Sequence, residues 1–161
     1  MNIKIDLGAV ESMLVFWTLV EEREKVSDRF LHDIAEMPQF QAVYDAEFGP
    51  ESLVKVLSAV SNRELLNGMS KKEGRFWNNN LWILENPGMM THMAAPLKTL
   101  NLTVDGDGEQ TVVFVPMTTE ESFVKEGVLY INFFRVMAGE WVETPTIEGL
   151  PIGEYILSKL A

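Results

Sequence analysis

The chain has 161 residues, no cysteine and a net charge of −11, from 24 acidic residues against 13 Lys and Arg. The lack of cysteine excludes disulfides, thiolate metal sites and cysteine nucleophiles. The acidic surface disfavours contact with the phosphates of nucleic acids. No apolar run reaches the roughly 20 residues of a membrane span, and no signal peptide is evident, so we expect a cytoplasmic protein without membrane contact.

Apolar residues at three- and four-residue spacing predict about four helices in residues 1–68. Before them, apolar and polar residues alternate over 3–7, which allows a short edge strand. An irregular lead-in is the alternative. The predicted helices cover 9–26, 28–37, 40–48 and 50–60. We expect Ser27 or Asp28 to cap the second, and Asn62 to begin a final short turn. The first is apolar on most of its circumference, which indicates deep burial or a shared interface.

The middle of the chain has the least regular pattern. The charged residues 70–75 predict a hinge or exposed loop, and residues 81–84 predict a strand. A methionine-rich apolar segment then ends before Pro96. We expect residues 76–96 to form the wall of a groove or a subunit interface, because methionine and tryptophan suit adaptable binding surfaces. The candidate groove or interface residues are Trp77, Trp82, Met89, Met90 and Met93.

The last third predicts mainly strands. Residues 100–104, in which apolar and polar side chains alternate, and residues 111–115 flank Gly106-Asp107-Gly108. This pattern predicts a hairpin. Residues 127–137 are apolar on both faces and predict a long central strand. We also expect a helical turn at 118–123, a turn at 138–139, a returning strand at 141–143 and a loop at 145–151. Residues 152–160 predict a short closing helix.

This order of elements favours an α+β fold rather than a parallel α/β fold. We expect one domain over residues 1–161, with a helical half (1–68) packed on a mainly β half (76–161). The β half is predicted to be an antiparallel meander sheet, followed by the short closing helix. The length of the chain suits one domain, and surface scaling predicts burial of about 70% of the unfolded surface.

Two patterns resemble parts of metal sites, and neither predicts one. The run from Asp105 to Glu109 resembles the start of a calcium loop, but Gln110 and Pro116 replace its required Gly and Glu. His32 and Glu36 share a helical face, yet one histidine and one carboxylate make an incomplete site. The sequence therefore predicts no metal, no cofactor and no catalytic residue, and we expect a protein that is not an enzyme.

Four polar residues are candidates for the wall of a small-ligand pocket. Arg135 and Asn132 interrupt the predicted central strand on opposite faces. A guanidinium binds a carboxylate ligand in a bidentate manner; otherwise Arg135 pairs with a carboxylate of the protein or lies at the rim. Such a pocket, between the helices and a curved sheet, would be lined by Arg135, His92, Tyr130 and Glu85.

These observations favour a non-catalytic binding or adaptor module that associates with itself as a homo-oligomer. Two alternatives stay open. One is an acidic, chaperone-like protein that holds a partner segment in a groove of methionine and tryptophan residues. The other is the small-ligand or enzymatic pocket beside Arg135. Native mass spectrometry separates them, because a clean dimer mass supports self-association and a monomer with a constant extra mass supports the pocket.

Overall fold

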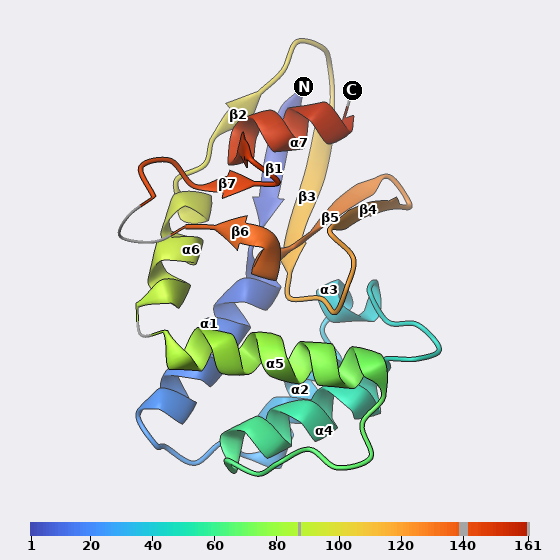
Figure 1. Ribbon diagram of the computed structural model, residues 1–161. Coiled ribbons are helices and arrows are strands. Elements are labelled where there is room, and N and C mark those ends of the chain that lie inside the picture. Colours follow the sequence, from blue (N-terminus) through green and yellow to red (C-terminus); the bar gives the residue numbers. More distant parts are fainter. Residues whose placement is uncertain (87, 139–141, 161) are drawn as a thin grey trace. The chain divides into compact units, whose positions relative to one another are not determined.

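A computed structural model describes residues 1–86, 88–138 and 142–160. Over these residues the protein has seven helices and two sheets, which confirms the predicted α+β class (Figure 1). The chain divides into two compact units. The sheet unit comprises Met1–Val10, Gly88–Pro116 and Glu120–Ala161. The helical unit comprises Glu11–Pro87 and Met117–Thr119.

The helical unit holds most of α1 and all of four further helices. The bounds are α1 Gly8–Glu21, α2 Asp28–Ala35, α3 Pro38–Gln41, α4 Pro50–Ser61 and α5 Lys71–Glu85. Helix α4 packs beside both α2 and α5 (Figure 1). The largest side chains that are almost completely buried in this unit are Phe16, Trp17, Phe40, Phe76, Met13, Leu31, Ile34, Leu53 and Leu57. Burial of these apolar groups is the main stabilising term of the unit.

Helices α1, α2 and α4 lie where apolar spacing predicted them. The Ser27 side chain caps α2 by accepting a hydrogen bond of 3.1 Å from the Phe30 N–H. The predicted third helix is shorter than expected, since α3 spans only four residues. Asn62 does not start a new turn; it is the C-cap of α4. The helical character of the first part of the chain was therefore predicted correctly, whereas the bounds of the individual helices differ in detail.

Helix α5 overturns two predictions for the middle of the chain. Residues 70–75 are not a loop, because Ser70 caps α5 and accepts a hydrogen bond from the Glu73 N–H at 3.1 Å. The Glu73 carboxylate accepts a hydrogen bond from the Ser70 N–H at 2.8 Å, completing a capping box. Residues 81–84 belong to the same helix and not to a strand.

The sheet unit contains a five-stranded sheet in the order β2-β1-β3-β5-β4. The strands are β1 Asn2–Asp6, β2 Leu102–Thr103, β3 Glu109–Val115, β4 Ser122–Lys125 and β5 Val128–Asn132. β3 runs parallel to β1 and to β5, whereas β2 and β4 are antiparallel to their neighbours. The sheet is therefore mixed, and the predicted antiparallel meander is wrong.

The predicted hairpin at 100–115 does not form, because β1 lies between its two arms. β1 pairs with β2 on one side, with Ile3 opposite Leu102, and with β3 on the other, with Ile3 opposite Gln110. The first strand is therefore internal and not an edge. The hairpin that does form joins β4 to β5 through Glu126 and Gly127, whose φ angles of 50° and 80° fit a type I′ turn. This hairpin replaces the helical turn expected at 118–123.

The long strand predicted at 127–137 is broken into three parts. β5 ends at Asn132, a 3₁₀ turn η1 covers Phe133–Arg135, and β6 Val136–Met137 joins a second sheet. That sheet has the order β6-β7-β8, with β7 Thr146–Ile147 and β8 Leu150–Pro151 inside the predicted loop. The expected turn at 138–139 and returning strand at 141–143 fall largely on residues outside those described, and Val142 is not in a strand.

Two further helices complete the sheet unit. α7 Ile152–Leu160 agrees with the predicted closing helix. α6 Met89–Lys98 contains Pro96, so the methionine-rich segment does not end before the proline as expected. Proline removes one helical hydrogen bond and crowds the preceding turn, yet Met93 and Leu97 are buried on this helix. Packing of this apolar face offsets the cost of the proline.

Tyr155 of α7 has a side chain whose pKa is strongly shifted by its surroundings. It is 2% exposed, and its hydroxyl lies 2.8 Å from Ser122 Oγ and also contacts the Glu121 carboxylate. Burial, followed by the hydrogen bond to Glu121, raises the pKa of Tyr155 to about 12. The hydroxyl therefore stays protonated at neutral pH and donates a hydrogen bond to the Glu121 carboxylate. The contact connects α7 to the start of β4.

Candidate ligand groove

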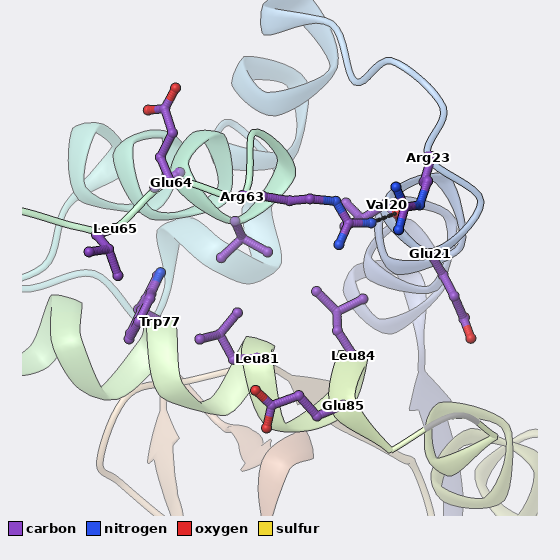
Figure 2. A pocket seen from close by; sticks show the side chains of 12 residues that line it. Val20, Glu21, Arg23, Arg63, Glu64, Leu65, Trp77, Leu81, Leu84 and Glu85 are labelled. Carbon is purple, nitrogen blue, oxygen red and sulfur yellow. Dashed lines mark hydrogen bonds between the residues drawn. The ribbon is translucent and has the colours of Figure 1, made fainter.

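The helical unit contains a groove of about 520 Å³ (Figure 2). The end of α1, the end of α4 with the residues that follow it, and α5 supply its walls. The apolar residues that line it are Val20, Ala59, Val60, Leu65, Trp77, Leu81 and Leu84. Charged residues complete the lining, namely Arg23, Arg63, Glu21, Glu64 and Glu85. Mostly apolar clefts of this volume with a few polar groups are typical of ligand sites.

The spacing along α5 explains why this helix presents a wall. Trp77, Leu81 and Leu84 are separated by four and three residues, so they lie on one face of the helix. Figure 2 shows the three side chains on the side of α5 that faces α4. Trp82 does not line the groove and is 45% exposed. The helix thus has two tryptophans with different surroundings.

Helices α1 and α4 end in the same way at the groove. Arg23 and Arg63 have φ angles of 59° and 55°, in the left-handed region that usually holds glycine after a helix. The Arg63 N–H bonds the Val60 carbonyl at 3.2 Å, and the Glu64 N–H bonds Ala59 at 2.9 Å. This is a Schellman motif, and α1 repeats it. The corresponding bonds of α1 are Arg23 N–H to Val20 at 3.1 Å and Glu24 N–H to Leu19 at 2.8 Å.

A left-handed arginine costs roughly 1–2 kcal/mol of local strain relative to a helical conformation. The same ending therefore places two guanidinium-bearing side chains at the groove at a conformational cost. The Arg63 side chain extends towards the end of α1, where its Nη2 donates to the Val20 carbonyl at 3.1 Å (Figure 2). Arg23 lies beside the same helix end.

The groove arginines have no carboxylate partner within the described ranges. No ion pair joins either of them to Glu21, Glu64 or Glu85, although all five line the groove. Figure 2 shows the Glu21 and Glu64 carboxylates pointing away from the space between α4 and α5.

Trp77 adds a polar group to the groove wall. Its Nε1 is buried and makes no hydrogen bond to any part of the chain that the structure describes. A buried N–H without an acceptor costs roughly 1–3 kcal/mol. By contrast, the Trp17 Nε1 of the same unit donates to Asn80 Oδ1 at 2.8 Å. Of these two tryptophans, the one at the groove is the one whose indole N–H has no acceptor among the described residues.

The four predicted pocket residues are divided between the two units. Glu85 lines the groove of the helical unit. In the sheet unit, Arg135 lies on η1 and its Nη1 is 3.3 Å from Glu148 Oε1, in a partly exposed ion pair. Tyr130 of β5 stacks on Phe123, with ring centroids 5.2 Å apart, and its pKa is raised mainly by burial. His92 is exposed on α6. A shared pocket of these four residues stays a prediction.

The predicted groove or interface residues also have different surroundings. Trp77 lines the groove, and Trp82 is exposed on the same helix. Met90 and Met93 are only 8% and 0% exposed, so they belong to the core of the sheet unit, and Met89 is half-buried. The sequence signal that was missed is Val-x-x-Arg-Glu, present at Val20–Glu24 and at Val60–Glu64. It marks both helix ends at the groove.

No group of three or more His, Asp or Glu able to hold a metal occurs among the described residues, and His32 and Glu36 are both exposed. No helix in the described ranges is long and apolar enough to cross a membrane. A scan of protein-family models and searches of curated proteins and of solved structures found no match to this chain.

Proposed function

We propose that this protein is a non-catalytic binding module and that the groove of the helical unit is its binding site. The observation that carries the proposal is the convergence of three helices on a groove with seven apolar side chains and two unpaired arginines. Leu65 is 80% exposed at the edge of this groove. Large apolar side chains left in water at a concave surface favour a bound partner or ligand.

A neutral polarity-sensitive dye tests this proposal without relying on charge. Nile red is expected to bind the native protein with a saturable rise in fluorescence. Leu65→Asp is expected to weaken binding at least tenfold, because a carboxylate at the groove loses hydration when the dye binds. The fold should be unaffected, since Leu65 is mostly exposed.

Val15→Asp is the matched control, because Val15 is 52% exposed on α1 and does not line the groove. It makes the same apolar-to-acid change in the same unit and is expected to leave dye binding unchanged. Loss of binding in Val15→Asp with no loss in Leu65→Asp contradicts the proposal and moves the binding site to α1. Failure of Nile red to bind the wild-type protein also contradicts it.

Self-association is a second candidate activity, favoured by one feature of α1. Leu14, Val15, Thr18 and Leu19 line a shallow hollow of about 250 Å³ on this helix. This apolar strip agrees with the prediction that the first helix is shared with a partner. Homo-oligomer formation through α1 stays a prediction, and the subunit number from native mass spectrometry of wild type and Val15→Asp decides it.

A further inference from the structure

Charge does not select the ligand of the groove. Three carboxylates, those of Glu21, Glu64 and Glu85, line it together with the two arginines, and all five side chains are exposed. Water and salt weaken the interactions of exposed charges, and Arg63 already donates to the Val20 carbonyl. A preference for one class of ligand therefore needs a polar group that is shielded from water.

The indole N–H of Trp77 is such a group. Its Nε1 is shielded from water and has no acceptor among the described residues, although the side chain lines the groove. Figure 2 shows the nitrogen on the edge of the ring that faces α4. A donor that has lost its water and gained no partner is destabilising until an acceptor reaches it. A ligand that supplies the acceptor gains a hydrogen bond without breaking one on the protein.

An acceptor reaches this nitrogen only if a side chain gives way, because the nitrogen itself is closed to water. Leu65 is placed to do so, since it lines the same groove, is 80% exposed and lies outside regular structure. Figure 2 shows its side chain extending towards the nitrogen edge of the Trp77 ring. Exposed side chains change rotamer within nanoseconds, so this movement does not require the helices to separate.

The wall around the indole is apolar. Leu81 and Leu84 continue it along α5, and Val60 lies on the α4 side (Figure 2). A hydrocarbon body placed there loses its contact with water, which is favourable in proportion to the apolar area buried. The volume of about 520 Å³ lies within the range of small-molecule sites.

The single donor in an apolar wall indicates which polar group the ligand carries. A carbonyl oxygen accepts hydrogen bonds and brings no donor of its own, whereas a hydroxyl brings an O–H that an apolar wall cannot satisfy. We propose that the groove binds a small neutral ligand with an apolar body and one carbonyl oxygen, which accepts a hydrogen bond from Trp77 Nε1. This proposal rests on the proposed function, because it names the class of ligand for the same groove.

The ketone 2-octanone and the alkene 2-methyl-1-octene test the acceptor, because they share one shape and differ only in oxygen against methylene. Displacement of Nile red, with the dye affinity determined for each variant, measures both affinities. Trp77→Phe keeps an aromatic wall and removes the N–H. It is expected to weaken 2-octanone by about fivefold or more and to leave 2-methyl-1-octene within about twofold. The alkene reports any change in the shape of the wall.

Trp82→Phe is the matched control, since Trp82 is exposed on the same helix and does not line the groove. It makes the same substitution and is expected to change neither affinity. Nitrogen-15 spectra of the wild-type protein give a second measurement that needs no variant of Trp77. Because hydrogen bonding moves the signal of an N–H proton downfield, 2-octanone is expected to move the Trp77 indole proton downfield and 2-methyl-1-octene is not.

The outcomes separate the carbonyl ligand from the proposed function. An unchanged affinity of Trp77→Phe for 2-octanone, or an equal loss for ketone and alkene, overturns the carbonyl ligand while Nile red binding in the groove still stands. Failure of both compounds to displace Nile red overturns it as well. If Trp77→Phe does not fold, the wild-type spectra decide, and an equal shift with both compounds overturns the proposal. If the dye binds and Leu65→Asp has no effect, the proposed groove function fails, and the carbonyl ligand fails with it.

Discussion

Replacing Asn80 with alanine is expected to lower the free energy of unfolding by about 2–4 kcal/mol. Asn80 is completely buried on α5 and accepts the hydrogen bond from Trp17 Nε1 at 2.8 Å. Its Nδ2 donates to the Phe76 carbonyl, also at 2.8 Å. The substitution removes the acceptor of a buried indole N–H and leaves a cavity. The small gain in helix propensity for alanine, about half a kcal/mol, does not compensate.

Urea titration followed by circular dichroism measures this loss. Asn78→Ala is the control, because Asn78 is exposed on the same helix and gains the same helix propensity. We expect it to match or slightly exceed wild-type stability. An Asn80→Ala protein within 0.5 kcal/mol of the Asn78→Ala protein would show that the buried contact between α1 and α5 is unimportant.

Replacing Asn132 with alanine is expected to destabilise the sheet unit by about 2–3 kcal/mol. Asn132 is 1% exposed and ends β5. Its Nδ2 donates to the Glu120 carbonyl at 2.9 Å, and its Oδ1 accepts from the Phe134 N–H at 3.0 Å. The second bond caps η1, so the side chain fixes the place where the strand becomes a turn. Alanine removes both bonds from a buried position.

Asn101→Ala serves as the control in the same unit, since Asn101 is exposed and lies outside regular structure. Hydrogen exchange of the β3 and β5 amide groups is the measurement, because it reports the opening of this sheet separately from the helical unit. Faster exchange confined to the sheet unit is expected for Asn132→Ala. Exchange rates equal to those of Asn101→Ala would contradict the role of the buried amide.

The helices could be predicted from the sequence wherever apolar spacing and local caps agree. The Ser27 cap and the apolar residues after it predicted α2, and Pro50 predicted the start of α4. Helix α5 was missed because the apolar run at residues 81–84 favoured a strand. Its capping box, Ser70-Lys-Lys-Glu73, was a local signal that could have found it. This signal is local, since the capping box lies within four consecutive residues.

The sheet could not be predicted in the same way, because its pairing is non-local. Turn residues at 105–108 predicted a hairpin, but β1, about 100 residues earlier, lies between the two arms. No local pattern encodes the insertion of a distant strand. The turn at Glu126 and Gly127 lacks the usual Asn-Gly or Asp-Gly pair, so it gave a weak signal.

The groove was predicted only in part. Trp77 was named as a candidate because tryptophan and methionine cluster near it, while Met90 and Met93 proved to be core residues. Apolar patterning does not separate a core face from a groove face, since both require the same residue types. Arg23 and Arg63 were missed because helix ends without glycine gave no reason to expect left-handed residues there.

The central claim, that the groove between α1, α4 and α5 binds apolar ligands, has a direct test in the indole N–H resonances of the tryptophans. Nitrogen-15 spectra recorded during titration with octanol, with Trp77→Phe used for assignment, follow these signals individually. Saturable movement of the Trp77 signal, with the signals of buried Trp17 and exposed Trp82 unchanged, is the predicted result. Movement of the Trp82 signal while that of Trp77 stays fixed would contradict the claim.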